Sequence, residues 1–411
     1  MKAGRYHLTS AQAAETLGIT RATLYAYASR GQLRSEPIPG RPKERRYYRE
    51  DLERLLERKE VRRDPDRAAA RGLHWGGPVL ESAITLIHNG RFYYRGRDGV
   101  ALASTASLEE AAGVLWDAAE PERQRLFAQP PALSARRLMQ LRAKDAFTLL
   151  QLALPVAAAV DLASYDLRPA AVRQTGARIV RLLATAIAPR DVDAPVHHAL
   201  QTVWAPRRRE VGDVIRTALV LCADHELNVS SFVARCAASA GASPYDVVSA
   251  ALAALKGYKH GGASERVLAL LAEAPTPKSA RASIASRLRR GEAVAGFGHP
   301  LYAAGDPRAS ALMQLAETSG NEREWRTIRH VAKAGSDLLQ DLPNLDFGLA
   351  AVTRTYCLPD QAPVLIFALG RTIGWIAHAI EQYASGQLIR PRARYTGPLP
   401  QVDAERVPTS R

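Results

Sequence analysis

The chain has 411 residues, of which 47% are hydrophobic and 24% are charged. This length exceeds what one hydrophobic core usually supports, and the apolar content excludes a mainly disordered chain, so we expect at least two globular domains. The 56 Lys and Arg against 41 Asp and Glu give a net charge of +15, which favours anionic substrates or polyanionic partners.

The sequence also bears on compartment and metal content. It has no basic segment followed by an apolar signal core and no run of about 18 uninterrupted apolar residues, so we expect a cytoplasmic protein without a membrane span. Cys222, Cys236 and Cys357 lie in apolar surroundings without metal-ligand spacing. We therefore expect reduced core thiols, no disulfide framework and no metal site.

Residues 1–65 predict a small separate domain, with 15 Lys and Arg against 9 Asp and Glu. Thr9 or Ser10 can cap a first helix, and Thr20 can cap a second that runs through Ser29, which gives a helix-turn-helix arrangement. Three side chains are expected on its outer face, namely Arg21, Thr23 and Tyr27. The positions expected to form its core are Ala13, Ala14, Leu17, Ile19, Leu24 and Tyr25.

A turn-rich basic segment at residues 37–46 follows, and a further helix is predicted over residues 50–62. The segments TSAQAAETLGITRATLYAYASRGQL and RRYYREDLERLL resemble the winged helix-turn-helix module of the MerR and excisionase type. The resemblance implies a recognition helix in the major groove and a basic wing on the phosphates, so residues 1–65 are expected to bind DNA. The alternative is a small domain used for packing or oligomer contacts.

Residues 61–71 are rich in Arg, Asp and Ala and predict a linker to a second domain. There, Asn89-Gly90 predicts a β-hairpin that continues over residues 92–94. Beyond this hairpin the apolar spacing is helical, so the expected fold class is all-α. The predicted helices cover residues 108–116, 145–154, 168–188, 210–222, 230–240, 244–255, 280–290, 310–318, 321–340, 346–356 and 362–385.

Four polar or glycine-rich segments interrupt these helices. Each places a candidate catalytic group at a helix end or in a glycine loop, where backbone amides can approach a ligand. The segments are residues 223–228, residues 259–263, residues 296–302 with 305–308, and residues 343–347.

In this order the segments resemble the citrate synthase family, since they read HELN, HGGA, GFGH with DPR, and PNLD. The resemblance runs from about Gly72 to Gly397. It implies a large helical domain formed by residues 72–262 and 358–411, with a small helical domain formed by residues 263–357. It also implies a homodimer in which the small domain closes over the substrates.

The activity implied by this resemblance is condensation of acetyl-CoA with oxaloacetate and water to give citrate and CoA, without a permanently bound cofactor. Such chemistry needs a carboxylate to remove a weakly acidic methyl proton and donors to stabilise the enolate oxygen. The resemblance assigns the base to Asp346, the enolate donor to His260 and polarisation of the oxaloacetate ketone to His299. It assigns His225 to oxaloacetate binding.

Oxaloacetate is a dianion, which planar guanidinium groups can hold through paired hydrogen bonds. The resemblance points to Arg308, Arg371 and Arg390, the last of these acting from the partner subunit of the dimer. Arg371 also stands out because it lies in an apolar helix, where an unpaired charge is costly. An internal salt bridge with Glu381 or Asp346 is the alternative for Arg371.

CoA is expected over the loop of Ala295, Gly296, Phe297 and Gly298, where missing side chains would leave room for the adenine. Three nearby basic residues could neutralise its phosphates or carry ordinary surface charge. These are Lys256, Lys259 and Arg266.

Three positions depart from the usual family pattern, namely Lys259 before His260, Ser264 in place of a common asparagine, and Pro300 after His299. They leave the acyl group open, so synthesis of 2-methylcitrate from propionyl-CoA is an alternative. A further alternative is a DNA-binding regulator whose second domain senses CoA esters or oxaloacetate.

Overall fold

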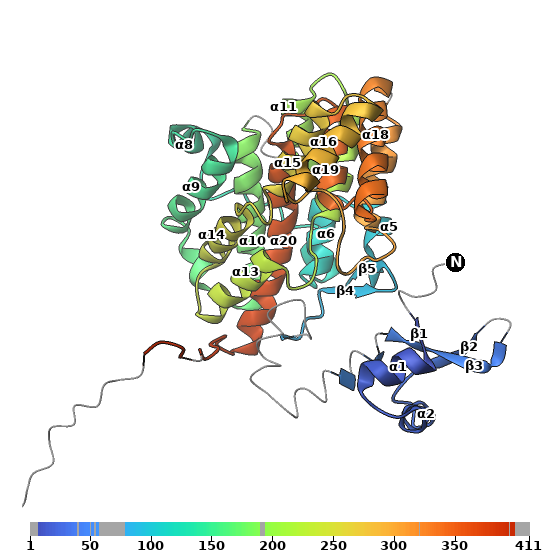
Figure 1. The fold of residues 1–411 in the computed structure, drawn as a ribbon. Coiled ribbons are helices and arrows are strands. Elements are labelled where there is room, and N and C mark those ends of the chain that lie inside the picture. Colours follow the sequence, from blue (N-terminus) through green and yellow to red (C-terminus); the bar gives the residue numbers. More distant parts are fainter. Residues whose placement is uncertain are drawn as a thin grey trace, which may run out of the picture.

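The computed structural model describes residues 7–38, 41–49, 51–52, 55–56, 79–189, 194–319, 321–393 and 395–398. Figure 1 shows a small N-terminal domain and a larger helical body. The all-α class predicted for the body is confirmed, because its described residues form many helices and one short three-stranded sheet. The linker predicted at residues 61–71 lies outside the described residues.

The N-terminal domain has the predicted helix-turn-helix. Helix α1 (Ser10–Leu17) begins at Thr9, which forms a capping box, and α2 (Arg21–Ser29) begins at Thr20. The basic segment forms an antiparallel hairpin, as a wing requires, whereas most of the helix predicted at residues 50–62 lies outside the described residues. The sheet has the order β1-β3-β2 and consists of β1 (His7–Thr9), β2 (Ser35–Ile38) and β3 (Arg41–Tyr48).

The core of this domain differs from the prediction at two tyrosines. Tyr25, expected in the core, is 49% exposed, whereas Tyr27, expected on the outer face, packs against the buried cluster around Leu24. The helix period explains the exchange, because residues three and four apart share a face while adjacent residues do not. Leu24, Tyr27 and Ala28 therefore point inward together.

The body opens with an antiparallel sheet of three strands, β4 (Thr85–His88), β5 (Arg91–Tyr94) and β6 (Arg97–Asp98). Asn89 and Gly90 have φ values of 50° and 73°, so the predicted two-residue hairpin turn is confirmed. The buried Tyr94 hydroxyl donates to the carbonyl of Asp224, just after α12 (Val211–Leu221). This bond ties the hairpin to a segment that carries a predicted site residue.

Most predicted helices are present within a few residues of their expected bounds, and those over residues 244–255 and 362–385 match them fully. The sequence pattern does not predict α5, α7, α8, α11 or α15. The remaining helices of the body are α5 (Gly99–Thr105), α6 (Leu108–Leu115), α7 (Glu120–Arg123), α8 (Ala135–Gln140), α9 (Ala146–Ala158), the 3-10 helix η1 (Leu162–Tyr165), α10 (Pro169–Ile187), α11 (Val196–Trp204), α13 (Val229–Ser239), α14 (Pro244–Leu255), α15 (Ala263–Glu273), α16 (Pro277–Arg289), α17 (Pro307–Glu317), α18 (Glu322–Leu339), α19 (Leu345–Thr355) and α20 (Ala362–Ser385).

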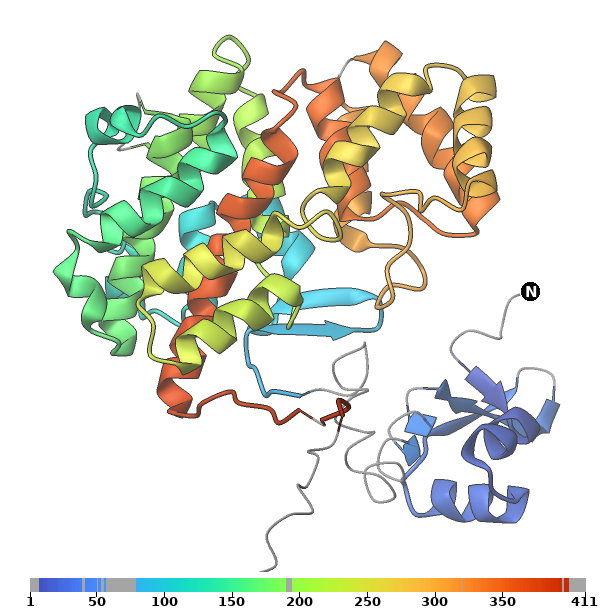
Figure 2. The same ribbon diagram turned by 60° about the vertical axis from the view of Figure 1, so that its left-hand side comes forward.

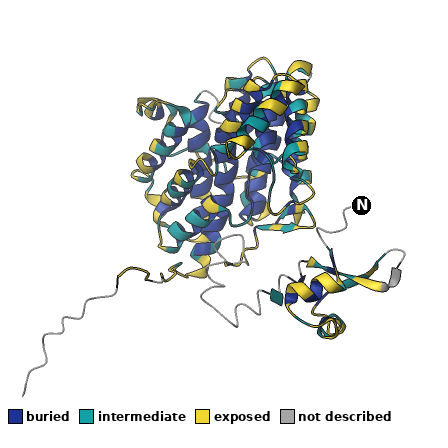
Figure 3. Ribbon diagram, in the orientation of Figure 1, coloured by how far each residue is buried: buried dark blue, intermediate teal, exposed yellow. Residues whose placement is uncertain are grey.

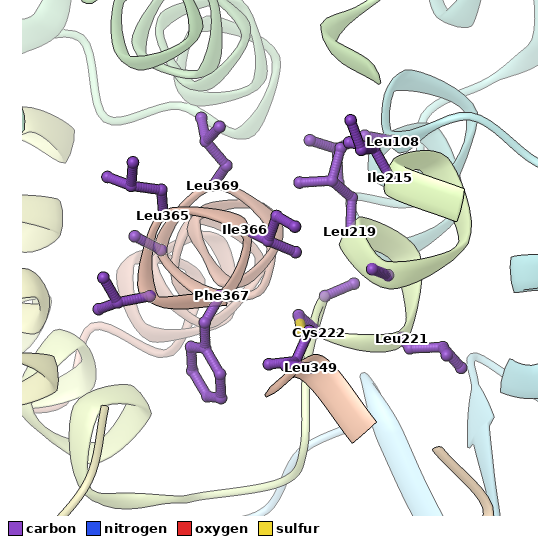
Figure 4. Packing of buried hydrophobic residues seen from close by; sticks show 14 of the residues in the cluster. Leu108, Ile215, Leu219, Leu221, Cys222, Leu349, Leu365, Ile366, Phe367 and Leu369 are labelled. Atoms are coloured by element: carbon purple, nitrogen blue, oxygen red, sulfur yellow. The ribbon is translucent and has the colours of Figure 1, made fainter. Parts of the chain in front are cut away.

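Helix α20 is the centre of the body and is buried along most of its length (Figure 3). Leu365, Ile366 and Leu369 project from it in different directions into the core (Figure 4). It is the one helix in the described residues that is long and apolar enough to cross a membrane, and its apolar window is wholly buried inside the protein. A core helix of a folded domain has these properties.

The helices α15 to α19 gather on one side of α20, whereas α8, α9 and α10 lie on its other side (Figure 1, Figure 2). This lobe covers nearly the residues predicted for the small domain, and the predicted boundaries at 263 and 357 stay a prediction. Of the three cysteines, Cys222 is buried and Cys236 is half-buried, but Cys357 is exposed just after α19. The core location expected for Cys357 is therefore wrong.

Two glycines allow α20 to approach the end of α12. A Cβ atom at Gly370 would lie 2.4 Å from the carbonyl oxygen of Leu219, and one at Gly374 would lie 2.3 Å from that of Ala223. Any larger residue would therefore push the helices apart. The close approach places Arg371, which lies between these glycines in sequence, beside the C-terminal end of α12.

Candidate active site

The predicted catalytic groups lie where helices begin or end. His225 follows α12, His260 lies between α14 and α15, His299 lies between α16 and α17, and Asp346 lies in the first turn of α19. The helix ends come from both sides of α20. They bring residues that are more than 100 positions apart in the chain into one site.

His225 occupies the centre of this site and is only 6% exposed. Its Nε2 atom lies 2.8 Å from the Tyr302 hydroxyl, and its ring lies edge-on to that of His299, with centroids 4.9 Å apart. Burial, together with the charges of Arg308 and Arg371, lowers the pKa of His225 well below its ordinary value. The imidazole is therefore neutral at physiological pH and suited to hydrogen bonding with a polar ligand.

His299 is held in one tautomer. Its Nδ1 atom accepts a hydrogen bond from the backbone N–H of Leu301 at 3.2 Å. Burial and the nearby Arg308 guanidinium lower the pKa of His299 to about 4. A neutral ring that accepts at Nδ1 carries its proton on Nε2, which can donate to a ligand.

His260 is anchored between α13 and α20. Its Nε2 atom lies 2.9 Å from the Ser230 hydroxyl, and its ring stands edge-on to Phe367, with centroids 5.5 Å apart. The indole of Trp375 donates to the same hydroxyl at 3.2 Å. Burial and the charge of Arg371 lower the pKa of His260 to about 4, so this imidazole is neutral as well.

Asp346 lies beside the N-terminal turn of α15. The Ser264 hydroxyl donates to its Oδ1 atom at 2.6 Å, and its backbone N–H donates to the Asn344 side chain at 3.1 Å. Burial raises the pKa of Asp346, although the Ser264 hydrogen bond and the Arg308 charge lower it in part. A carboxylate with a raised pKa is a stronger base for proton abstraction.

Arg308 is buried and forms a bidentate pair with Asp306, at 2.9 Å for Nε and 2.8 Å for Nη2. Burial by itself lowers the pKa of Arg308, but the Asp306 carboxylate raises it above its ordinary value, so the side chain stays cationic. Asp306 also accepts the backbone N–H of Leu345 at 3.1 Å. Asp306 has no predicted role, although the residue is part of the DPR motif.

Arg371 is 1% exposed, and its Nε atom donates to the carbonyl of Cys222 at 2.8 Å. No ion pair joins it to an acidic side chain in the part of the chain that the structure describes. Glu381 pairs with Arg235 at 2.8 Å, and Asp346 accepts from Ser264, so the alternative of an internal salt bridge is wrong. Burial lowers the pKa of Arg371, which means that an anionic ligand would relieve an electrostatic cost.

Asp224 and His378 form a buried contact behind the site, and neither residue is among the predicted site residues. Asp224 Oδ1 lies 3.2 Å from His378 Nε2, outside good hydrogen-bond geometry, and Oδ2 accepts from Thr85 at 2.6 Å. Burial raises the pKa of Asp224, but the nearby His378 and Arg371 lower it below its ordinary value. Asp224 is thus a charged group that partly balances Arg371. Its position next to His225 in the HELN segment is the signal that could have revealed it.

Arg390 is not brought together with the other predicted site residues. It is exposed in the segment after α20, and no hydrogen bond or ion pair among the described residues joins it to them. Its predicted role across a dimer interface stays a prediction.

The loop at residues 295–298 is shaped by packing against the protein. Gly296 has a φ of 92°, and a Cβ atom there would lie 2.6 Å from Val267. Gly298 has a φ of 75°, and a Cβ atom there would lie 3.0 Å from Asp341. Both glycines are therefore needed for packing within the protein, and the predicted contact of this loop with CoA stays a prediction. A small pocket does open beside this loop, lined in part by His299.

The three basic residues near His260 are exposed. Lys256 donates to Gln151 at 3.2 Å, Lys259 lies 5.8 Å from the ring centroid of Tyr258, and Arg266 donates to the Tyr258 carbonyl at 3.0 Å. Both expectations for them, contact with phosphates or ordinary surface charge, stay open.

Two protein families match this chain, and known proteins are similar to it over part or most of its length. The family described as "Citrate synthase, C-terminal domain" matches residues 72–392, and a helix-turn-helix domain family matches residues 8–60. "Citrate synthase 2" of Bacillus subtilis is 30% identical over 363 residues, which cover 80% of this chain and 96% of that protein. "Citrate/2-methylcitrate synthase" of the same organism is 39% identical over 190 residues, which cover 44% of this chain and 50% of that protein.

Solved structures are similar over the same region. Citrate synthase from Thermotoga maritima has a TM-score of 0.67 at 26% identity and covers 81% of this chain and 96% of that one. The ternary complex of citrate synthase from Thermoplasma acidophilum with carboxymethyl coenzyme A and oxaloacetate has a TM-score of 0.69 at 25% identity. The similarity covers 83% of this chain and 98% of that one.

Proposed function

The chain belongs to the citrate synthase family, and on that premise we propose that it condenses acetyl-CoA with oxaloacetate and water to give citrate and CoA. The observation that supports this reaction most directly is the meeting of three neutral histidines, one carboxylate and two buried guanidinium groups at one site. The expected cytoplasmic location is part of the same proposal.

In the first step, the Asp346 carboxylate takes a proton from the methyl group of the thioester, and His260 donates a hydrogen bond to the resulting enolate oxygen. The Ser230 hydroxyl donates to Asn228 Oδ1 at 2.8 Å and also lies 2.9 Å from His260 Nε2. Donation to the enolate from His260 Nδ1 therefore requires Ser230 to turn its hydroxyl hydrogen from Asn228 to His260 Nε2 when the substrates bind.

In the second step, the enolate carbon attacks the ketone of oxaloacetate, and the Nε2–H of His299 donates a hydrogen bond that stabilises the new alkoxide until water protonates it. Arg308, Arg371 and His225 hold the substrate carboxylates, since guanidinium groups in a site of low dielectric bind carboxylates strongly. Water then hydrolyses the thioester, which releases the carboxylic acid and the free thiol of CoA.

The reaction is tested by oxaloacetate-dependent thiol release with acetyl-CoA or propionyl-CoA, with the product identified by mass. We expect a higher kcat/KM with acetyl-CoA, with citrate as the product. A strong preference for propionyl-CoA would instead assign the chain to 2-methylcitrate synthesis. Absence of oxaloacetate-dependent thiol release with both thioesters would contradict the proposed reaction class.

A homodimer in which Arg390 completes the partner's site is also part of the proposal. Exposed apolar side chains on α9, η1 and the turn between them support self-association, because a monomer rarely leaves so many on one short segment. These side chains are Leu152, Val156, Val160, Leu162 and Tyr165.

Co-expression of Arg390→Ala with Asp346→Ala tests this arrangement. A mixed dimer has one site with an intact Asp346 and an intact Arg390 from its partner, so random mixing should restore about a quarter of the unmodified activity. Each variant alone should be nearly inactive. If the mixture is no more active than its components, or if Arg390→Ala alone keeps full activity, Arg390 does not act across the interface.

The N-terminal domain is proposed to bind DNA through α2 and the basic hairpin. Arg21 and Tyr25 are exposed on α2, and Arg45 is exposed on β3. We expect duplex binding that weakens steeply with salt and that is lost when residues 1–65 are deleted. Retained thiol release in the deleted chain, combined with no salt-sensitive duplex binding by the full chain, would contradict a regulatory function.

A further inference from the structure

Ser264 lies where α15, which follows the proposed enolate donor His260, contacts α19, which carries the proposed base Asp346. It belongs to the first turn of α15, four residues after His260, and is 1% exposed. Its hydroxyl donates to Asp346 Oδ1 at 2.6 Å, across 82 positions of sequence. A short hydrogen bond to a carboxylate is among the stronger polar interactions in a buried site.

The Ser264 hydroxyl contacts the Asp346 carboxylate directly, whereas the nearby charged groups act on it from a distance. The charged groups that influence the carboxylate are Arg308, Asp306 and Arg266, and none of them forms an ion pair with it among the described residues. Arg308 is engaged by Asp306, and Arg266 donates to a backbone carbonyl. The hydrogen bond from Ser264 is therefore the direct side-chain contact that fixes the orientation of the carboxyl group.

We propose that Ser264 is a positioning residue for the base: its hydroxyl holds Asp346 Oδ1 and leaves Oδ2 to take the proton from the thioester methyl group. The inference rests on the proposed function. It adds to that function a residue that presents the base in a single orientation, since reacting groups must be aligned before proton transfer.

The same hydrogen bond stabilises the ionised form of the base. Burial raises the pKa of Asp346, and the Ser264 hydroxyl opposes this shift. Removing the hydroxyl should raise the pKa further, because the charged carboxylate loses a donor. The base acts only when it is ionised, so the acidic limb of the kcat profile should move to higher pH.

The test compares Ser264→Ala with the unmodified chain in pH profiles of oxaloacetate-dependent thiol release. We expect kcat to fall about 30-fold at neutral pH, the value that follows from losing one hydrogen bond to a charged group. We also expect the acidic limb to move to higher pH. Ser264→Thr keeps the hydroxyl and should restore both the rate and the profile toward those of the unmodified chain.

Ser231→Ala is the matched control. Ser231 is also a fully buried serine, and its hydroxyl has no hydrogen-bond partner in the described part of the chain. Its removal should leave the pH profile unchanged. If Ser264→Ala does not fold, Ser264→Cys keeps the shape with a weaker donor and should show the same direction of change.

Three outcomes are distinguishable. A shifted acidic limb in Ser264→Ala, absent in Ser231→Ala, supports the positioning role. An unshifted limb with kcat equal to that of the control overturns it, even if the chain is an active synthase. An unmodified chain without oxaloacetate-dependent thiol release overturns the proposed function and the positioning role together.

Discussion

Replacement of Arg371 by Met is expected to lower kcat/KM for oxaloacetate roughly 1,000-fold, the effect of losing two charge-assisted hydrogen bonds to a carboxylate. The folded chain should nevertheless be as stable as before or more stable. Among the described residues Arg371 is buried without an ion pair, and its polar contact there is one bond to the Cys222 carbonyl. Its guanidinium also lies 4.6 Å from the ring centroid of Phe367, a contact that methionine can replace in part.

This opposite behaviour of activity and stability follows from the cost of burying a charge. A cation without a carboxylate partner is unfavourable in the folded protein, and a ligand carboxylate would relieve that cost. The result is measured by steady-state kinetics with oxaloacetate as the varied substrate and by thermal unfolding without ligand. A large loss of stability together with normal kinetics would mean that Arg371 serves the fold and not the ligand.

Arg235→Met is the matched control for this experiment. Arg235 is also buried, but it is paired with Glu381 and donates to Gln382 at 2.8 Å. Its removal leaves the Glu381 carboxylate without its cation, so we expect a loss of about 3 kcal/mol in the free energy of unfolding. The kinetics of the folded fraction should change little, because this ion pair is not part of the predicted site.

Local signals in the sequence predict most elements of the fold. Thr9 and Thr20 cap the first two helices, and Asn89-Gly90 forms the hairpin turn, because these preferences act within a few residues. Helix α15 is missed because it begins directly at the polar and glycine-rich segment around His260. The exchange of Tyr25 and Tyr27 is a different kind of error, since the helix period alone could have corrected it.

The site is predictable in its members but not in their connections. The motifs point to His225, His260, His299 and Asp346. The rings of His225 and His299 meet, and the charges of Arg371 and Arg308 act on His225 as well as on His260 and Asp346 respectively. The contact between Tyr302 and His225 depends on long-range packing, and so does the hydrogen bond from Ser264 to Asp346. The same holds for the approach of α20 to α12, which decides that Arg371 faces a carbonyl instead of an acid.

The substitution Asp346→Ala is expected to have the largest effect on turnover. Asp346 accepts from the Ser264 hydroxyl and pairs with no cation among the described residues, whereas Asp306 pairs with Arg308. Loss of a positioned base lowers rates by about 100- to 10,000-fold, so kcat should fall within or below that range. Oxaloacetate binding should stay within a few-fold, because the groups assigned to the substrate carboxylates remain in place.

The most direct test is therefore thiol release with acetyl-CoA and oxaloacetate, measured for the unmodified chain and for Asp346→Ala, together with calorimetric titration of oxaloacetate into both. We expect turnover that requires oxaloacetate in the unmodified chain, almost none in the variant, and similar oxaloacetate affinity in the two. Turnover near the unmodified level in Asp346→Ala would contradict its assignment as the base and, with it, the proposed mechanism.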